Sequence, residues 1–217
     1  DADEAVKFFR RSAAAGNANA QYQLGLAYRD GVGTLKSEEE AIRWLNKAMD
    51  QKNMYAVAVL SGCYLRGQGV PKSGEKALEL AEDAAEEGNA LGKVALADCY
   101  LAGVGCDAEE APAKAKALYE EAAKANCAEA YLGLGKMKRS GRLGEADLAA
   151  SFADLKKAAD LGSVEACALV GECYYNGTGV KADRQQAEKY FRRGVAFGSA
   201  QAQCLLGRAY LKKDKKY

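Results

Sequence analysis

Apolar and small residues recur along this chain at helical spacing, and the pattern itself repeats about every 36 residues. In the first half of each unit, mainly apolar residues such as Phe8, Phe9, Ser12 and Ala13 share one helix face. In the second half, a small residue, an aliphatic residue, another small residue and a tyrosine also fall on one face. Each unit therefore predicts two amphipathic helices, which we call helix A and helix B.

A small residue opens each unit and sets the register of the repeat. The openers are Ala5, Ala41, Ala77, Ala115, Ser151 and Ala187, which lie 36, 36, 38, 36 and 36 residues apart. A fixed period of this length is typical of stacked helical repeats. We therefore expect an all-α, α/α solenoid of six helix-turn-helix repeats as a single domain over residues 1–217. The predicted repeats cover residues 5–40, 41–76, 77–114, 115–150, 151–186 and 187–217, the last of them truncated.

Glycines mark the predicted turns. Counting the opener as offset 0, offset 11 carries glycine in four repeats, where helix A needs a terminal residue that tolerates positive φ. Lys52 and Asn126 are the exceptions at this offset. A Gly-x-Gly sequence at offsets 26 and 28, such as Gly31 and Gly33, is expected to end helix B and turn the chain into the next repeat.

The offsets from 15 onward carry a recognisable motif. Residues 20–33 read Ala-Gln-Tyr-Gln-Leu-Gly-Leu-Ala-Tyr-Arg-Asp-Gly-Val-Gly, and residues 166–180 follow the same pattern. This motif resembles the Sel-1-like repeat (SLR) family, relatives of the tetratricopeptide repeats, and the resemblance covers essentially the whole chain. It implies a right-handed superhelix of TPR-like helix pairs, whose A helices line a concave face that holds other proteins.

Three departures from the repeat stand out. Lys138 replaces the tyrosine at offset 23 of the fourth repeat, and the third repeat has two extra residues and Pro112, which predict a longer loop. Asp154 occupies offset 3 of the fifth repeat, where the other repeats have apolar residues. A carboxylate in such a position must be paired or solvated. Two interpretations stay open: a rotated helix in which Phe152 takes the core place, or a functional acid.

The charge balance argues against a nucleic-acid-binding surface, and the short apolar runs argue against a membrane-spanning helix. The chain has 31 Lys and Arg against 30 Asp and Glu, a formal net charge of +1. Neither a basic patch on the scale of nucleic-acid binders nor an apolar run near the roughly 20 residues of a spanning helix is present. We expect a protein or peptide partner, no nucleic acid and no membrane insertion, while the oligomeric state stays open.

The seven cysteines do not have the spacing of disulfides or zinc ligands. Cys63, Cys99 and Cys173 share offset 22, so equivalent atoms in adjacent repeats should lie about 8 to 10 Å apart, beyond the roughly 7 Å limit for a bridge. The chain has no C-x2-C motif and no histidine, which makes a zinc site improbable. Reduced, buried cysteines favour a reducing compartment such as the cytoplasm, although an exported fragment stays possible.

No catalytic constellation is recognisable in the sequence. Without histidine there is no Ser-His or Cys-His relay. Ser73 and Lys76 match an S-x-x-K motif, which keeps a β-lactam-interacting enzyme as a remote alternative, but the companion motifs are absent and Ser73 stands where a helix cap belongs. We therefore expect a non-enzyme with no catalytic residue, no cofactor and no metal.

Charged residues on the solvent face of helix A provide the candidate binding surface. Basic residues in the outer repeats flank acidic residues in the middle ones. The candidates are Arg10, Arg11, Arg43, Lys47, Glu79, Glu82, Asp83, Glu120, Glu121, Lys156, Lys157, Lys189, Arg192 and Arg193. A partner segment with acidic ends and a basic centre would complement this groove. The alternative interpretation is a solvated face with weak ion pairs at the two sign changes.

Two functions are therefore compatible with the repeat. The first is a non-catalytic scaffold that binds a partner protein or peptide in the groove lined by the A helices. The second is a secreted bacterial SLR factor that engages a host protein or a cell-wall component with its convex face.

Overall fold

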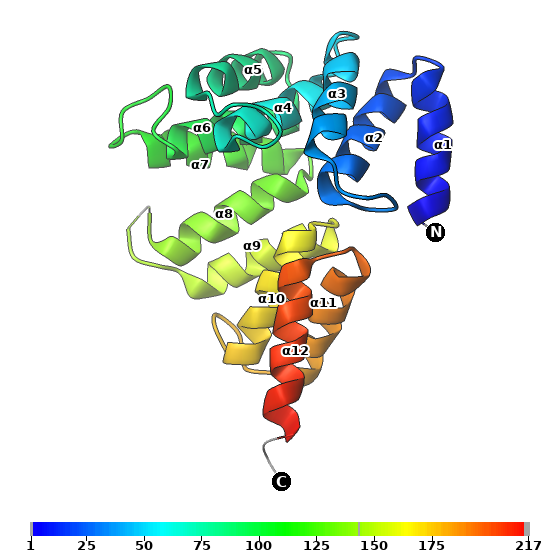
Figure 1. Cartoon of the computed structure of the whole chain (residues 1–217). Helices are drawn as coiled ribbons and strands as arrows, with labels where there is room; N and C mark the ends of the chain where they lie inside the picture. Colours follow the sequence, from blue (N-terminus) through cyan, green and yellow to red (C-terminus); the bar gives the residue numbers. More distant parts are fainter. Residues whose placement is uncertain (1, 143, 215–217) are drawn as a thin grey trace. The chain divides into compact units, whose positions relative to one another are not determined.

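The structure of the chain is a computed structural model that describes residues 2–142 and 144–214, with side chains described up to residue 211. These ranges contain twelve α-helices and no strand (Figure 1). The helices are α1 (Ala2–Ala14), α2 (Ala18–Asp30), α3 (Glu38–Met49), α4 (Met54–Arg66), α5 (Gly74–Glu86), α6 (Ala90–Leu101), α7 (Ala111–Lys124), α8 (Ala128–Ser140), α9 (Leu148–Asp160), α10 (Val164–Asn176), α11 (Arg184–Ala196) and α12 (Ala200–Asp214). Odd-numbered helices are the predicted A helices and even-numbered ones the B helices, so the all-α repeat fold is confirmed.

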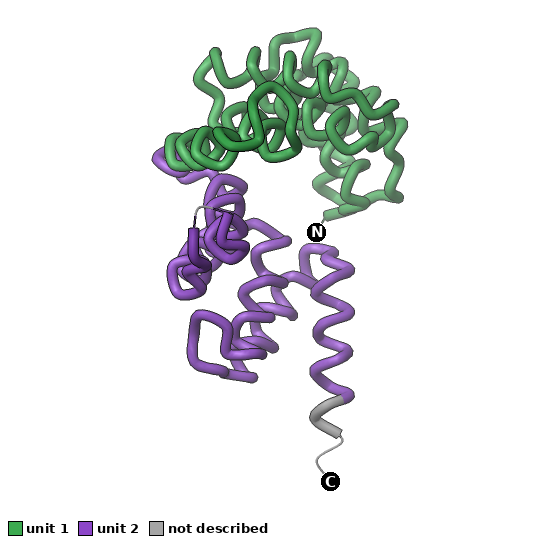
Figure 2. Tube along the Cα trace, turned by 90° about the vertical axis from the view of Figure 1, so that its left-hand side faces the viewer, with its two compact units in different colours: residues 1–122 green, residues 123–217 purple. Residues whose placement is uncertain are grey.

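The chain divides into two compact units, residues 1–122 and 123–217 (Figure 2). Within each unit, the two helices of a repeat pack together and helix B also packs on helix A of the following repeat. This second contact joins α2 to α3 and α4 to α5 in unit 1, and α8 to α9 and α10 to α11 in unit 2. A single solenoid domain over residues 1–217 stays a prediction, and residues 215–217 of the predicted last repeat lie outside the described part.

Helix B approaches the next helix A so closely that offset 20 must be small. An ideal Cβ built on Gly25, Gly135 or Gly171 would lie 2.7, 2.8 or 2.5 Å from the side chain of Leu45, Leu155 or Phe191, respectively. Each of these larger side chains stands at offset 4 of the following repeat. Ser61 occupies the same position between the second and third repeats, where its hydroxyl donates to the Ala77 carbonyl at 2.6 Å. The residue at offset 4 of the following repeat is the small Ala81 at this junction, and the hydrogen bond satisfies the buried Ser61 hydroxyl.

The residue after helix A adopts positive φ, as the sequence predicts. The four glycines at offset 11 have φ between 75° and 103°, and the two exceptions adopt the same region, with φ of 60° at Lys52 and 55° at Asn126. Asparagine tolerates this conformation, but for lysine it costs about 1 kcal/mol. Lys52 is therefore a strained residue in a turn where most repeats use glycine.

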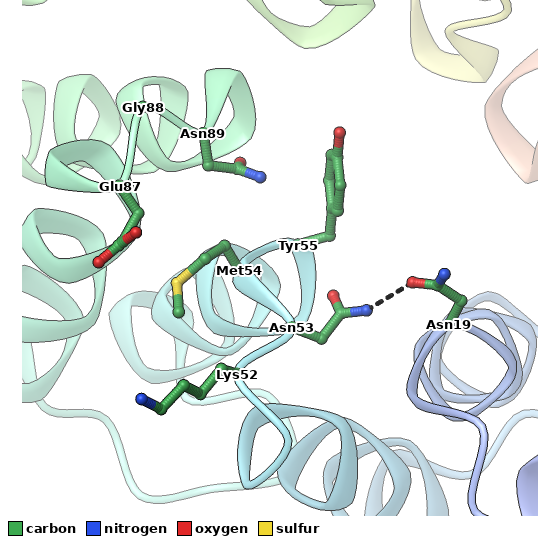
Figure 3. A pocket seen from close by; sticks show the side chains of 8 residues that line it. All are labelled: Asn19, Lys52, Asn53, Met54, Tyr55, Glu87, Gly88 and Asn89. Carbon is green, nitrogen blue, oxygen red and sulfur yellow. Dashed lines mark hydrogen bonds between the residues drawn. The ribbon is translucent and has the colours of Figure 1, made fainter.

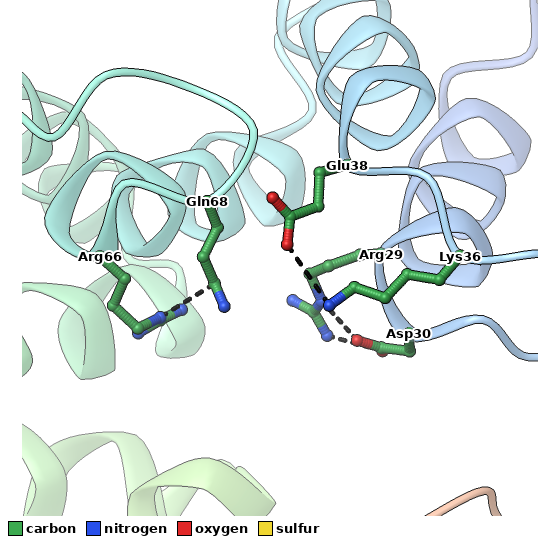
Figure 4. A network of polar contacts seen from close by, with 6 residues as sticks. All are labelled: Arg29, Asp30, Lys36, Glu38, Arg66 and Gln68. Carbon is green, nitrogen blue, oxygen red and sulfur yellow. Dashed lines mark hydrogen bonds and ion pairs between the residues drawn. The ribbon is translucent and has the colours of Figure 1, made fainter.

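A polar network ties the closing turns of the first two repeats together (Figure 4). The Glu38 carboxylate pairs with Lys36 at 3.3 Å and accepts a hydrogen bond from the Gly69 N–H at 3.1 Å. Gly69 comes so close to α3 that an added Cβ would lie 2.8 Å from the Glu38 carbonyl oxygen. Arg29 pairs with Asp30 at 2.7 Å at the end of α2. These pairs stabilise the turns, whereas among the described residues the Arg66 guanidinium of the same network donates only to the neutral Gln68 side chain, at 3.1 Å.

The two polar departures of the fourth and fifth repeats form one ion pair. Elsewhere offset 23 and offset 3 of the next repeat are apolar or aromatic, as where Tyr174 stacks on Tyr190 with ring centroids 5.8 Å apart. At the α8–α9 contact, Lys138 and Asp154 hold these places, and their Nζ and Oδ2 atoms lie 2.6 Å apart. Phe152 packs against the core cluster, as the first interpretation proposed. This pairing was not predicted from the sequence, because Lys138 and Asp154 belong to different repeats and each departs from the pattern on its own.

This pair predicts a compensated double mutant. Only 32% of the Lys138 side chain and 16% of the Asp154 side chain is exposed, so Lys138→Tyr or Asp154→Leu alone leaves a half-buried charge without its partner. We expect each single change to lower the free energy of unfolding by about 1–2 kcal/mol. The double variant restores the tyrosine-leucine combination of the earlier repeats and should recover most of that loss, as measured by denaturant unfolding in a double-mutant cycle.

The exposed pair Lys136–Glu165 is the matched control. Its Nζ and Oε1 atoms lie 2.7 Å apart, close to the 2.6 Å of the Lys138–Asp154 pair, but its side chains are 49% and 50% exposed. The coupling energy from Lys136→Ala and Glu165→Ala should stay below about 0.5 kcal/mol. Equal coupling energies in the two double-mutant cycles would show that burial does not determine how much the Lys138–Asp154 pair contributes to stability.

Candidate functional site

Helix α5 presents an unpaired acidic face. Glu79, Glu82, Asp83 and Glu86 follow i, i+3, i+4, i+7 spacing and are exposed, because the opposite stripe of α5, which includes Ala77, Ala81 and Ala84, is buried. In the described part of the chain, none of these four carboxylates belongs to a salt bridge. We call these four residues the acidic face.

The basic residues of α3 are held by an aromatic ring. The Lys47 ammonium lies 4.4 Å from the Trp44 ring centroid, and the Arg43 guanidinium lies 5.8 Å from it. Arg43 also pairs with Glu40 at 3.1 Å, and the Trp44 indole N–H donates to the same carboxylate at 3.1 Å. Among the described residues, no salt bridge joins these cations to the acidic face, so the first sign change of the predicted groove lacks the ion pair of the alternative interpretation.

The remaining groove candidates of unit 1 differ in whether their side chains form hydrogen bonds or ion pairs. On α1, Arg10 donates to the Thr34 hydroxyl at 3.1 Å, and Arg11 is exposed. On α7, Glu120 pairs with Lys116 at 3.6 Å and Glu121 with Lys93 at 2.7 Å.

In unit 2, the candidates lie on α9 and α11. Lys156 and Arg193 approach Asp160 at 3.5 and 3.6 Å, and Arg192 pairs with Glu188 at 3.0 Å. Lys157 lies 6.0 Å from the Tyr131 ring centroid, and Lys189 is exposed. A groove that runs over all six A helices stays a prediction.

An open pocket of about 380 Å³ lies at the A–B turns of unit 1 (Figure 3). The first three repeats contribute its lining, which consists of Asn19, Lys52, Asn53, Met54, Tyr55, Glu87, Gly88 and Asn89. We call these eight residues the turn pocket. The turn pocket was not predicted from the sequence, although Lys52 at a position that otherwise favours glycine was a signal of it.

Asparagines shape the turn pocket by capping the B helices. Asn53 accepts from the Ala56 N–H at 3.1 Å, and Asn89 accepts from the Gly92 N–H at 2.9 Å, each through Oδ1. The Asn53 amide nitrogen then donates to Asn19 at 2.9 Å. Asn17 caps α2 in the same way. Three consecutive repeats therefore present an asparagine at offset 12, each with its orientation set by the backbone.

Ser73 and five of the described thiols show no sign of nucleophilic activation. Ser73 accepts a hydrogen bond from the Lys76 N–H at 3.3 Å and thereby caps α5, as expected from the sequence. Cys63, Cys99, Cys167 and Cys173 are buried, and burial raises the pKa of each of these thiols. Burial also raises the pKa of Cys127 to about 11. These thiols are therefore protonated at neutral pH, which makes them poor nucleophiles.

The described residues contain neither a membrane-spanning helix nor a cluster of metal ligands. None of the helices in this part of the chain has the length and apolar character needed to cross a membrane. The same residues contain no group of three Cys, Asp or Glu arranged to hold a metal ion.

The helices and their contacts define the class of protein: an α-solenoid built from TPR-like helix pairs. The Sel1 repeat family model matches residues 1–17, 18–53, 54–89, 90–127, 128–163 and 164–196, so the chain belongs to the Sel1 repeat family. Proteins built from this repeat are generally non-catalytic scaffolds for protein interactions. Comparison with curated proteins finds no match.

Solved structures of related proteins share the fold. The protective antigen c5321 of uropathogenic Escherichia coli, which displays an SLR fold, is 28% identical with a TM-score of 0.60, and the match covers 98% of this chain and 45% of that one. A Sel1 repeat protein from Oxalobacter formigenes is 27% identical with a TM-score of 0.56, over 96% and 60% of the two chains. A putative Sel1 repeat protein from Klebsiella pneumoniae is 23% identical with a TM-score of 0.63, over 94% and 99%. The chain thus spans less than two thirds of the first two relatives.

Cysteine exposure predicts the order of alkylation. Cys204 is exposed, Cys106 and Cys127 are half-buried, and the other four thiols are buried. Iodoacetamide at about pH 7.5 should label Cys204 first and the buried thiols only after unfolding, because burial limits both access and thiolate formation. Mass spectrometry of time-quenched samples with and without denaturant measures the order, and labelling of Cys63 or Cys99 as fast as Cys204 would contradict it.

Proposed function

We propose that this chain is a scaffold that binds a segment of a partner protein across the exposed faces of its A helices, with the acidic face as the main contact in unit 1. One observation carries the proposal: four carboxylates lie on one face of α5 over two helix turns, and no described cation forms a salt bridge with them. Such a cluster is unfavourable in the free protein and gains when a positive segment approaches it.

Charge complementarity in unit 1 also predicts how the partner segment is oriented relative to α3 and α5. The basic centre of the segment would lie on the acidic face, and an acidic end would approach Arg43 and Lys47 on α3, the preceding A helix. Opposite charges in this order increase the association rate and set the register of binding more than they raise affinity.

No observation favours the other two functions, a secreted factor for a host or cell-wall component and a β-lactam-interacting enzyme. The Sel1 repeats are compatible with a secreted factor without pointing to one. Ser73, the proposed nucleophile of the enzyme, is engaged as a helix cap.

Charge reversal on the acidic face tests the scaffold proposal. The double change Glu82→Lys and Asp83→Lys turns the face from four negative charges to a balanced one, so we expect partner retention to fall about tenfold or more. The measurement is affinity purification from the source cells with quantitative mass spectrometry, at low salt and again at high salt, where wild-type binding should also weaken.

Glu109→Lys with Glu110→Lys is the matched control, because it makes the same change in net charge at exposed residues just before α7. This control should retain the partner. The melting temperature of both variants should stay near that of the wild type, since surface charges contribute little to stability. The same set of captured proteins from all three forms would exclude the acidic face as the binding surface.

A further inference from the structure

The turn pocket contains groups that the packing of the repeats does not use. Its lining combines an oriented amide donor, an exposed aromatic ring and two opposite charges. It shares no residue with the acidic face, so its function can be tested separately from the proposed function.

The first group is the side-chain amide of Asn89. Because its Oδ1 atom accepts the capping bond from Gly92 at 2.9 Å, the orientation of the whole amide is fixed. Figure 3 shows the Asn89 nitrogen directed toward the side of the pocket where Tyr55 stands. Within the described structure, this nitrogen has no hydrogen-bond acceptor, whereas the equivalent nitrogen of Asn53 donates to Asn19. Asn89 is therefore a preorganised donor for a carbonyl oxygen.

The second group is the apolar wall formed by Tyr55 and Met54. The Tyr55 side chain is 53% exposed, which is high for an aromatic residue. Its ring centroid lies 5.9 Å from that of Tyr22, and the ring also lines the pocket. Met54, the preceding residue, lines another part of the pocket and is half-buried. An apolar side chain bound here would cover exposed aromatic surface, which is favourable.

The third group is the ammonium of Lys52. Lysine keeps this position despite its φ of 60°, where glycine would relieve the strain. No salt bridge in the described part of the chain involves Lys52, although Glu87 lines the same pocket. Lys52 can pair with one carboxylate of a ligand, while Glu87 disfavours a second carboxylate on its side of the pocket.

We propose that the turn pocket binds an extended segment of a partner protein that carries one acidic residue next to an apolar residue. A main-chain carbonyl of the segment accepts a hydrogen bond from the Asn89 amide. The apolar side chain covers Tyr55 and Met54, and the acidic side chain pairs with Lys52. Each contact is modest alone, and together they select for a short two-residue pattern.

A defined set of peptides tests the proposal. The probes are fluorescein-labelled nonapeptides with blocked ends, built of Gly and Ser around a central Leu-Glu or Glu-Leu pair, with Leu-Lys and Ser-Glu as comparison peptides. Fluorescence anisotropy at low salt should show that one of the first two binds at least about fivefold more tightly than either comparison peptide. Equal binding of all four peptides, or no binding of any up to about millimolar concentration, would overturn the proposal.

Two substitutions separate binding from folding. Asn89→Ser keeps a helix cap, since serine caps the B helix at the same offset through Ser163 and Ser199, but it removes the amide donor. We expect about fivefold weaker binding of the preferred peptide. Asn17→Ser, the same change outside the pocket, should leave binding unchanged.

Lys52→Gly should change stability and binding in opposite directions. Loss of the strained φ should raise the denaturation midpoint, whereas loss of the ammonium should weaken peptide binding about fivefold. Asn126→Gly, at the same offset of the fourth repeat, is the control and should leave binding unchanged. Undiminished peptide binding to both Lys52→Gly and Asn89→Ser would refute the pocket, while the effect of Glu82→Lys with Asp83→Lys on partner capture would still decide the acidic face.

Discussion

The close contact between each helix B and the next helix A is the constraint on which the rest of the fold depends. At Gly25, Gly135 and Gly171 the helices approach so closely that a methyl group would collide with the facing side chain. Repeats of this kind contact only their neighbours, so stability accumulates through these junctions rather than through one central core. Ser61 shows how the constraint can be met otherwise, because the facing residue is the small Ala81 and the Ser61 hydroxyl donates to the Ala77 carbonyl. Both Ser61 and Ala81 are fully buried in this junction and are inaccessible to a ligand.

Variation between the repeats does not by itself mark a functional residue. Asp154 breaks the pattern as clearly as any residue in the chain, yet its carboxylate pairs with Lys138, the other broken position of the same junction. The carboxylates of Glu82 and Asp83 replace Asn46 and Lys47 of the preceding repeat and belong to no salt bridge among the described residues. A polar residue that departs from the repeat is therefore a candidate for partner recognition only if its side chain has no ion pair or hydrogen bond within the fold.

The repeat allowed much of the fold to be predicted from the sequence, because helix faces, turns and caps are local properties. The turn at offset 11 shows this well: the requirement for positive φ held even for Lys52 and Asn126. The Lys138–Asp154 pair was missed because it joins residues 16 positions apart on two helices, and only the B–A contact brings them together. The turn pocket was missed for a related reason. Its lining comes from three turns spaced one repeat apart, and the sequence of each turn alone is that of an ordinary helix cap.

Preorganisation connects the two candidate binding surfaces. The Asn89 amide is oriented by a capping bond, and the backbone of the acidic face is fixed by the burial of the opposite side of α5, so the backbone of neither surface has to order itself when a partner arrives. Binding to such groups loses little conformational entropy in the scaffold, and most of the ordering cost falls on the partner segment. A segment that reaches more than one repeat adds contacts without further ordering of the scaffold, which raises its effective local concentration at each successive contact. Affinity in a stacked scaffold therefore grows with the length of the bound segment, while selectivity comes from the few unsatisfied groups, such as Lys52 and Glu82, that interrupt an otherwise repetitive surface.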